Sequence, residues 1–360
     1  MNKKLYFGIN LFILFLFIYF RLYLRAINLF WTDEIEEIKN LISLKHLIFQ
    51  YLPQIPGGSP GHYLLTFPFN ILYPYNKYVL MIPGLLSQVA VFILIPGVIV
   101  KLFKTNLYET QITALITRII FTFDPTLSYQ SIEIRPYSIL PLLWVSIAIL
   151  LPTIYDQTIR KTSFIGPFKK FLLILCLFIL IIFHYYVLLM MISVYAYIYL
   201  NSHQKVKDYL LNSYSKIVSI GTLLSIPILM YFSPGSFSFN FDTLGVINEY
   251  FSNYSFLKSN GVNRIYWQNF LYYAFIILSL IIPIVLIKVK LERHEKLIKS
   301  LLRYLIKSIG ILAVFPIVII FFLDLYNHYW FLLRQFAWAM IPLYMSVGLF
   351  ISKLLFIRHK

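Results

Sequence analysis

The sequence predicts an all-α polytopic membrane protein that forms one integral membrane domain over residues 1–360. Of its residues, 60% are hydrophobic and 12% are charged, whereas a soluble domain carries about 25% charged residues. Apolar stretches of about 18–20 residues, the length with which a helix crosses a bilayer, recur from one end to the other. A membrane β-barrel would show short alternating segments instead. The single cysteine, Cys176, excludes a disulfide within the chain and a multi-thiolate metal site.

The apolar stretches predict about ten transmembrane helices. The first follows a basic start, and because no small-residue cleavage site comes after it, we expect an uncleaved span rather than a signal peptide. The expected spans cover residues 5–24, 78–100, 108–127, 136–154, 171–186, 187–201, 216–232, 269–287, 308–325 and 336–352.

The distribution of charge predicts the orientation of these spans. Most of the 31 Lys and Arg residues fall in connections on one side, which also holds both ends of the chain. The positive-inside rule therefore places both termini in the cytoplasm. The net charge of +17 is then a signal of topology, and we expect membrane lipids but no nucleic acid as partners. A composition rich in Ile, Lys, Asn, Phe and Tyr suggests a bacterial plasma or inner membrane.

Three connections on the outer side are large or unusual. The first, residues 26–77, contains apolar pieces too short to cross a bilayer, which predict interfacial helices. The second, residues 123–138, joins the third and fourth spans, and the third, residues 233–268, is a candidate lid. The cytoplasmic connections are short and contain neither a Gly-rich phosphate loop nor an HExxH motif. We therefore expect any chemistry on the outer side.

The stretch WTDEIEEI follows the first span and concentrates acid in a basic protein: Asp33, Glu34, Glu36 and Glu37. One interpretation is a helix start, in which Asp33 caps free backbone amides and the glutamates lie in the first turn, where the helix dipole favours acid. The other interpretation is that Asp33 acts in catalysis. The local pattern leaves both open.

A second candidate lies in the segment SIEIRPYSIL. Pro136 suits the first turn of the fourth span, which places Arg135 at the positive end of a helix. A cation there opposes the helix dipole unless an anion joins the site, and a helix start plus an arginine binds phosphate well. Alternatively, Arg135 extends along the interface and pairs with Glu133.

Several motifs occur in an order that resembles one family. They are WTDE after the first span, SPGHYLL later in the same connection, MIPGLLS at the second span, SIEIRPYSILPLL at the fourth, HYYVLLM at 184–190 and LRQFAWAMIPLY at 333–344. Together they resemble the GT-C class of membrane glycosyltransferases, in particular the family 39-like branch. That branch contains protein O-mannosyltransferases and lipid A aminoarabinose transferases.

The resemblance implies an inverting transfer of a sugar from a polyprenyl-phosphate donor to an acceptor hydroxyl at the outer face. Asp33 would be the catalytic base, and Glu34 would orient a sugar or acceptor group. Arg135 and Arg334 would bind the departing phosphate, since the planar guanidinium binds two oxygens and stays charged. The remaining candidates for substrate binding are His62, Tyr63, Glu133, Tyr137, His184 and Tyr185. Tyr and His are also common in interfacial belts, which is the alternative for these residues.

Two other classes of function remain open. A transporter or flippase of an anionic lipid or sugar would line its path with Arg118, Arg135 and Arg334, although the sequence shows no internal repeat. A polysaccharide polymerase or ligase would share the lipid-linked donor. Asp33, Glu34 and Glu133 offer oxygen ligands, but we predict neither a metal nor another cofactor. We assign no role to Arg118, near the middle of the third span, or to Asp124.

Overall fold

The secondary structure is helical throughout the part of the chain that the structure describes. The computed structural model describes residues 3–28, 30, 32–54, 60–159, 167–184, 186–201, 295–319 and 338–357. Within these ranges, four helices are long and apolar enough to cross a membrane: Lys4–Ile27, Lys77–Phe103, Pro136–Ile154 and Lys299–Ile319. Their length and composition indicate an integral membrane protein.

Most of the expected spans coincide with helices. These helices are α1 (Lys3–Ile27), α6 (Ile82–Phe103), α7 (Leu107–Phe123), α9 (Leu140–Ile159), α10 (Pro167–Phe183), α11 (Tyr186–Leu200), α15 (Glu295–Ile309) and α17 (Met340–Ile357). The span expected over 308–325 begins earlier, because the helical run starts at Glu295 and continues through η6 (Gly310–Val314). The spans expected over 216–232 and 269–287, and the candidate lid, lie outside the described residues.

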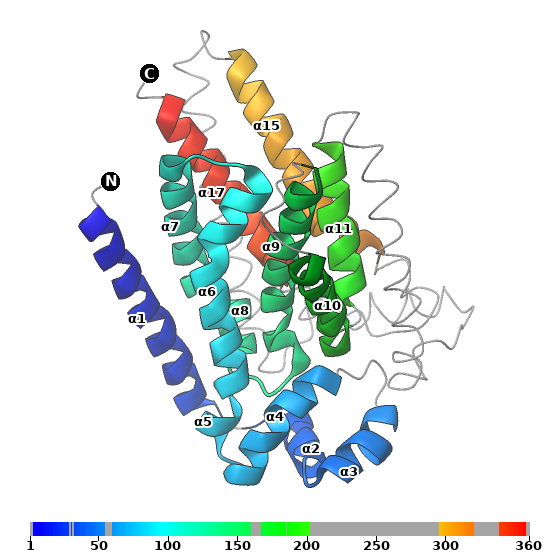
Figure 1. Ribbon diagram of the computed structural model, residues 1–360. Helices are drawn as coiled ribbons and strands as arrows, with labels where there is room; N and C mark the ends of the chain where they lie inside the picture. Colours follow the sequence, from blue (N-terminus) through cyan, green and yellow to red (C-terminus); the bar gives the residue numbers. More distant parts are fainter. Residues whose placement is uncertain are drawn as a thin grey trace, which may run out of the picture.

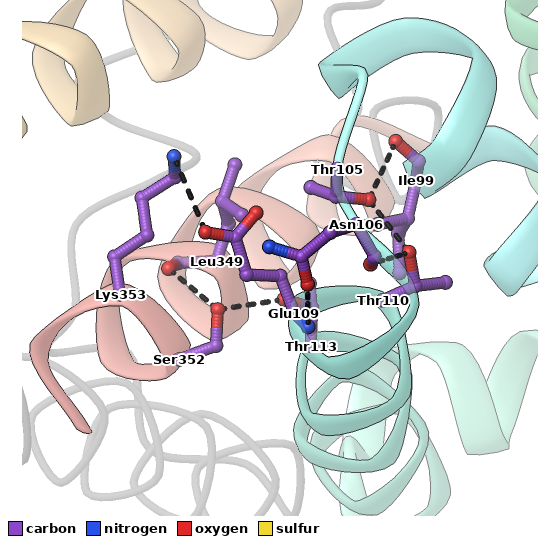
Figure 2. Close-up of polar contacts among 9 residues, drawn as sticks. All are labelled: Ile99, Thr105, Asn106, Glu109, Thr110, Thr113, Leu349, Ser352 and Lys353. Carbon is purple, nitrogen blue, oxygen red and sulfur yellow. Dashed lines mark hydrogen bonds and ion pairs between the residues drawn. The ribbon is translucent and has the colours of Figure 1, made fainter. Parts of the chain in front are cut away.

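Helices α7 and α17 pack closely at the end of the bundle that carries both chain termini (Figure 1). Figure 2 shows the polar contacts there: the Thr113 hydroxyl donates to Ser352 Oγ at 3.0 Å, and Lys353 Nζ lies 3.8 Å from Glu109 Oε1. Gly348 permits the approach, since a Cβ at this position would lie 2.9 Å from the Thr113 carbonyl oxygen. Small and hydroxyl-bearing residues therefore join these helices, as is common in membranes.

Arg118, which had no role in the sequence, is held by the helices around it. Its Nε donates to the Phe92 carbonyl at 2.8 Å, and Nη1 donates to Asn10 Oδ1 at 2.6 Å. Its guanidinium also lies 4.8 Å from the Phe92 ring centroid. These contacts satisfy a charge that is costly inside a membrane, so Arg118 joins α1, α6 and α7.

Asp124 has a structural position as well. Its Oδ1 accepts a hydrogen bond of 2.6 Å from the Leu127 amide, which caps α8 (Pro125–Gln130), and its Oδ2 accepts one from the Tyr344 hydroxyl. The positive charge of Arg21, whose guanidinium donates to carbonyls at the end of α7, lies near this carboxylate. Asp124 therefore joins α1, α8 and α17 at the start of the segment that follows α7.

The first outer connection forms short helices at the end of the bundle opposite to both termini (Figure 1). They are α2 (Thr32–Asn40), α3 (Leu44–His46), η1 (Leu47–Tyr51), η2 (Leu52–Gln54), α4 (Pro60–Leu72) and α5 (Lys77–Leu80). Leu41, Leu47, Leu52 and Tyr63 form a small core beneath them. Apolar side chains on the other faces are exposed, among them Phe49 and Leu72. Exposed apolar faces on short helices are what an interfacial position would require, and that position stays a prediction.

The second outer connection ends in a short 3-10 turn. After α8, residues 131–139 run through turns to η3 (Pro136–Ser138), and α9 begins at Leu140. Arg135 is extended, with φ −137° and ψ 155°, because the following proline disfavours helical angles. The helical run thus begins at Pro136 as expected, but the regular α-helix starts about one turn beyond Arg135.

Candidate functional site

Three segments meet at the end of the bundle opposite to both termini: α2, α4 and residues 131–139 (Figure 1). Ile134 packs with Ile38 and Leu80 in a small apolar cluster. On α4, the Asn70 amide donates to the Leu41 carbonyl at 3.0 Å, which ties α4 to the end of α2. Acidic, basic and imidazole side chains from all three segments gather around this cluster, although they are far apart in the sequence.

Glu34 connects α2 to both neighbours. Its Oε1 accepts the Ile134 amide at 2.8 Å and lies 3.5 Å from Arg25 Nη1. Both side chains are almost fully buried, with exposed fractions of 1% for Arg25 and 2% for Glu34. Arg25 also donates to the Lys77 carbonyl at 3.2 Å. The Glu34 carboxylate is therefore engaged by the protein itself, which suits a group that positions α2.

Asp33 lies one residue before Glu34, within the first turn of α2, and its side chain is outside the described part of the structure. Because α2 begins at Thr32, Asp33 is inside the helix rather than at the residue that precedes it. The helix thus begins one residue before Asp33, so the prediction that Asp33 is the N-cap residue of α2 is wrong. A carboxylate in the first turn still agrees with the helix dipole.

Glu37 belongs to this cluster, although the sequence analysis placed it only in a helix start. Its Oε1 lies 3.5 Å from Arg135 Nε, and its side chain is 10% exposed. The Tyr63 hydroxyl hydrogen-bonds the same carboxyl group. Glu36, the preceding residue, is exposed and pairs with Lys39 at 3.7 Å. The signal in the sequence was the spacing of Glu34 and Glu37, which places both on one face of a helix.

Burial sets the protonation of Glu37. Removal from water raises the pKa of Glu37 to about 8, against the lowering effects of Arg135 and Tyr63, while nearby Glu34 and Glu133 add to the rise. At neutral pH the carboxyl group is therefore mostly protonated. Burial likewise raises the pKa of Tyr63 and of Tyr51, which stacks edge-on against Tyr63 at 5.7 Å.

His62 and His184 lie close together at the junction of α4 and α10. Burial lowers the pKa of each to about 3, so both rings are neutral. Gly61 permits this approach, since a Cβ there would lie 2.8 Å from the Phe183 ring. The Ile134 carbonyl is near the His62 ring. Neither ring nitrogen of His62 has a hydrogen bond of normal geometry within the described residues. His184 Nδ1 accepts the Tyr186 amide at 3.2 Å.

These pKa shifts predict that thermal stability is greatest near pH 6.5. An unfolded histidine binds a proton below about pH 6.5, but His62 and His184 stay neutral in the folded protein, so stability falls as pH falls. Glu37 acts oppositely. Its folded pKa of about 8 exceeds the ordinary 4.5, so stability falls as pH rises from 4.5 to 8. Between pH 4.5 and 6.5, two histidines outweigh one glutamate.

Melting temperatures in one detergent at pH 5 to 9 measure this dependence. Glu37→Gln is expected to remove the decline above pH 6.5 and to keep the decline at acid pH. A melting temperature that rises steadily from pH 5 to pH 9 in the wild-type protein would contradict the assignment of a protonated Glu37.

The other predicted site residues are placed as follows. Glu133 is buried, and its charge acts on Arg25 and Glu37. Tyr137 lies in η3, near Tyr63. Arg334 and Tyr185 lie outside the described residues. Arg25, which the sequence analysis did not select, joins the cluster. Arg25 could have been found from the sequence, because it is a charged residue near the end of an apolar helix, four residues after Arg21.

Within the described ranges, no three His, Cys, Asp or Glu side chains are grouped as a metal ion would require. Comparison of the chain with models of protein families, with curated proteins and with solved structures finds no match. The function is therefore argued from the chemistry of this cluster.

Proposed function

We propose that this protein is an inverting glycosyltransferase that moves a sugar from a polyprenyl-phosphate donor to an acceptor hydroxyl on the outer face of the membrane. The observation that carries the proposal is the meeting of α2 with residues 131–139. It joins Glu34 to the Ile134 amide and Glu37 to Arg135, the candidate partner of a phosphate, and Asp33 belongs to the first turn of the same helix. The family resemblance of the motifs at these two segments gives the same pairing of roles.

The chemistry requires a base and a cation. The acceptor oxygen attacks the anomeric carbon as the bond from that carbon to the phosphate oxygen breaks, with inversion at the carbon. The Asp33 carboxylate takes the hydroxyl proton, and Arg135 stabilises the charge that develops on the departing phosphate. Arg334 is proposed for the same phosphate. Glu34 is proposed to hold α2 in place through Arg25 and the Ile134 amide.

The proposed topology agrees with this location. We propose about ten spans in a bacterial plasma membrane, with both termini in the cytoplasm. The start of α1 and the end of α17 lie at one end of the bundle, and α2 and α4 lie at the other (Figure 1). A prenyl chain in the bilayer reaches such a site from the side, as the interfacial position of α4 would allow.

A transporter receives less support. Its path required Arg118, but this guanidinium is held by Asn10 and by the carbonyls of Phe92 and Ile93. A polymerase or ligase with a lipid-linked donor would not need the acid that directly follows the first span.

Asp33→Asn is expected to abolish sugar transfer and to leave expression and thermal stability near those of the wild type. Asparagine is nearly isosteric with aspartate but accepts no proton, and it is tolerated at helix starts as aspartate is. The measurement is transfer of labelled sugar from polyprenyl-phosphate sugars in membranes that contain the full-length protein. Full transfer by Asp33→Asn would show that Asp33 is not the base.

A further inference from the structure

Several buried polar atoms where α2, α4 and residues 131–139 meet have no hydrogen bond partner within the described residues. They are Glu37 Oε2, both ring nitrogens of His62 and Arg25 Nη2. Buried polar atoms in proteins are nearly always hydrogen-bonded, and exceptions often mark a site that takes a ligand or water. Here the unused atoms include donors and acceptors from α1, α2 and α4. The side chains at this junction therefore have hydrogen-bond donors and acceptors that contacts among the described residues leave unused.

The ion pair between Glu37 and Arg135 is loose for a buried pair. Its atoms, Glu37 Oε1 and Arg135 Nε, are 3.5 Å apart, whereas charge-assisted hydrogen bonds measure about 2.7–2.9 Å. The second carboxyl oxygen, Oε2, has no hydrogen bond. An arginine binds an anion best through two parallel hydrogen bonds. Glu37 is therefore a weak partner that a better-fitting anion can replace.

The charges around Glu37 favour its neutral form once an anion has replaced it at Arg135. Glu34 lies on the same helix, and Glu133 lies beside Arg135 on the facing segment. Tyr63 on α4 and Tyr51 on η1 contribute hydroxyl groups and no positive charge. Arg135 is the cation that acts on this carboxyl group. An anion bound to Arg135 would thus leave Glu37 among acids, where a carboxylate is disfavoured.

We propose that Glu37 occupies the anion subsite of Arg135 while the site is empty, and that a phosphate group displaces it, leaving Glu37 as the neutral acid. The inference rests on the proposed function for the identity of the anion, a phosphate group. A phosphate oxygen replaces the carboxyl group beside Arg135, and where Glu37 is ionised, above pH 8, the proton it takes up comes from solvent. No covalent bond of the phosphate forms or breaks in this step. Glu37 is a specificity-determining residue, because it rejects weaker anions from Arg135.

Displacement of Glu37 by phosphate makes the affinity for phosphate depend on pH above about pH 8. Burial raises the pKa of the free Glu37 to about 8, so at pH 7 the group is already mostly protonated and the affinity changes little with pH. Above pH 8 the free protein must take up a proton to bind, so Kd rises with pH, about fivefold from pH 8 to pH 9 and approaching tenfold per pH unit beyond. The second ionisation of a phosphate monoester such as undecaprenyl phosphate, near pH 6, is complete in this window and does not contribute. That of inorganic phosphate lies higher, so for this probe only the titrations above pH 8 are compared.

The experiment uses the full-length protein in detergent and two probes, undecaprenyl phosphate and inorganic phosphate. Calorimetry at pH 9, in two buffers of different ionisation enthalpy, counts the protons taken up, and titrations from pH 7 to pH 9 give Kd. We expect nearly one proton per phosphate at pH 9 and a Kd that rises about fivefold between pH 8 and pH 9. For Glu37→Gln we expect no proton uptake, a Kd independent of pH, and tighter binding than wild type at pH 9.

Glu36→Gln is the matched control, since Glu36 is exposed on the same helix and pairs with Lys39. It is expected to bind with the same proton uptake as the wild type. The inference is overturned if phosphate binds without proton uptake, if Glu37→Gln behaves as the wild type does, or if neither probe binds. Sugar transfer is measured in a separate assay. A negative binding result would therefore contradict the role of Glu37 without contradicting the glycosyltransferase activity.

The two probes distinguish the source of the anion. Proton-linked binding of undecaprenyl phosphate supports the exchange at a lipid donor site, and the same result without sugar transfer would contradict only the proposed enzyme. Proton-linked binding of inorganic phosphate alone supports the exchange at Glu37 but contradicts the lipid-linked donor.

Discussion

Arg135→Gln is expected to reduce sugar transfer by about 10²–10³-fold, the typical loss when one group that stabilises developing charge is removed. The fold should tolerate the change. Glu37 lies 3.5 Å from Arg135, and burial raises the pKa of Glu37 to about 8. At pH 7 the variant therefore leaves a mostly neutral carboxyl group, which avoids the large cost of an unpaired buried charge. Loss of activity with retained stability would identify a functional arginine.

The measurement compares the rate of transfer and the melting temperature in the same preparations. Arg135→Lys keeps the charge but not the planar fork, so it should retain part of the activity. Arg303→Gln is the control, because Arg303 is exposed on α15, at the end of the bundle away from α2 (Figure 1). Transfer by Arg135→Gln at the wild-type rate would remove Arg135 from the proposed mechanism.

Arg25→Met is expected to destabilise the protein by about 3–5 kcal/mol, because it leaves a buried carboxylate without its partner. Glu34 is 2% exposed and loses the guanidinium that lies 3.5 Å away. Methionine is apolar and unbranched, so it fills part of the space of the arginine stem. The unpaired Glu34 carboxylate should turn toward water. It would then release the Ile134 amide, which it accepts at 2.8 Å, and loosen the contact between α2 and residues 131–139.

The double variant Arg25→Met/Glu34→Gln tests the cause. The glutamine oxygen still accepts the Ile134 amide but carries no charge, so most of the lost stability should return. Such coupling between neighbours is what a double-mutant cycle measures. Lys39→Met is the matched control, since it breaks the exposed pair with Glu36, and exposed pairs contribute about 0–1 kcal/mol. Melting temperatures of Arg25→Met and Lys39→Met that fall equally would refute a structural role for the buried pair.

The positions of the helices were largely predictable from the sequence. Apolar length determines a transmembrane helix, because backbone amides inside a bilayer must be satisfied within the segment itself. The expected spans 5–24 and 187–201, for example, correspond to α1 and α11. The start of α15 was missed because charged residues interrupt its apolar pattern. Long basic side chains still permit a helix there, since their stems lie along apolar surface while the charges reach water.

The candidate site was predictable as a set of segments but not as a set of contacts. The sequence analysis brought the acidic stretch, His62, Tyr63, Glu133, Arg135 and His184 to one side of the membrane. It did not separate Glu36 from Glu37, which are adjacent and chemically identical. Only one of them faces Arg135, because α2 turns about 100° per residue and docks on residues 131–139 through Ile38.

By itself the sequence determined the class of protein and the approximate ends of its helices, and it predicted that acid and arginine collect on one side of the membrane. These properties follow from local composition, since transfer into a bilayer depends on apolar length and on flanking charge. The tertiary structure decided which charges are satisfied within the protein. Arg118 is held by Asn10 and carbonyls of α6, Glu34 by Arg25 and Ile134, and Glu37 only loosely by Arg135. Such partners are up to 108 positions apart in the chain, so only the packing of the helices brings them within contact distance.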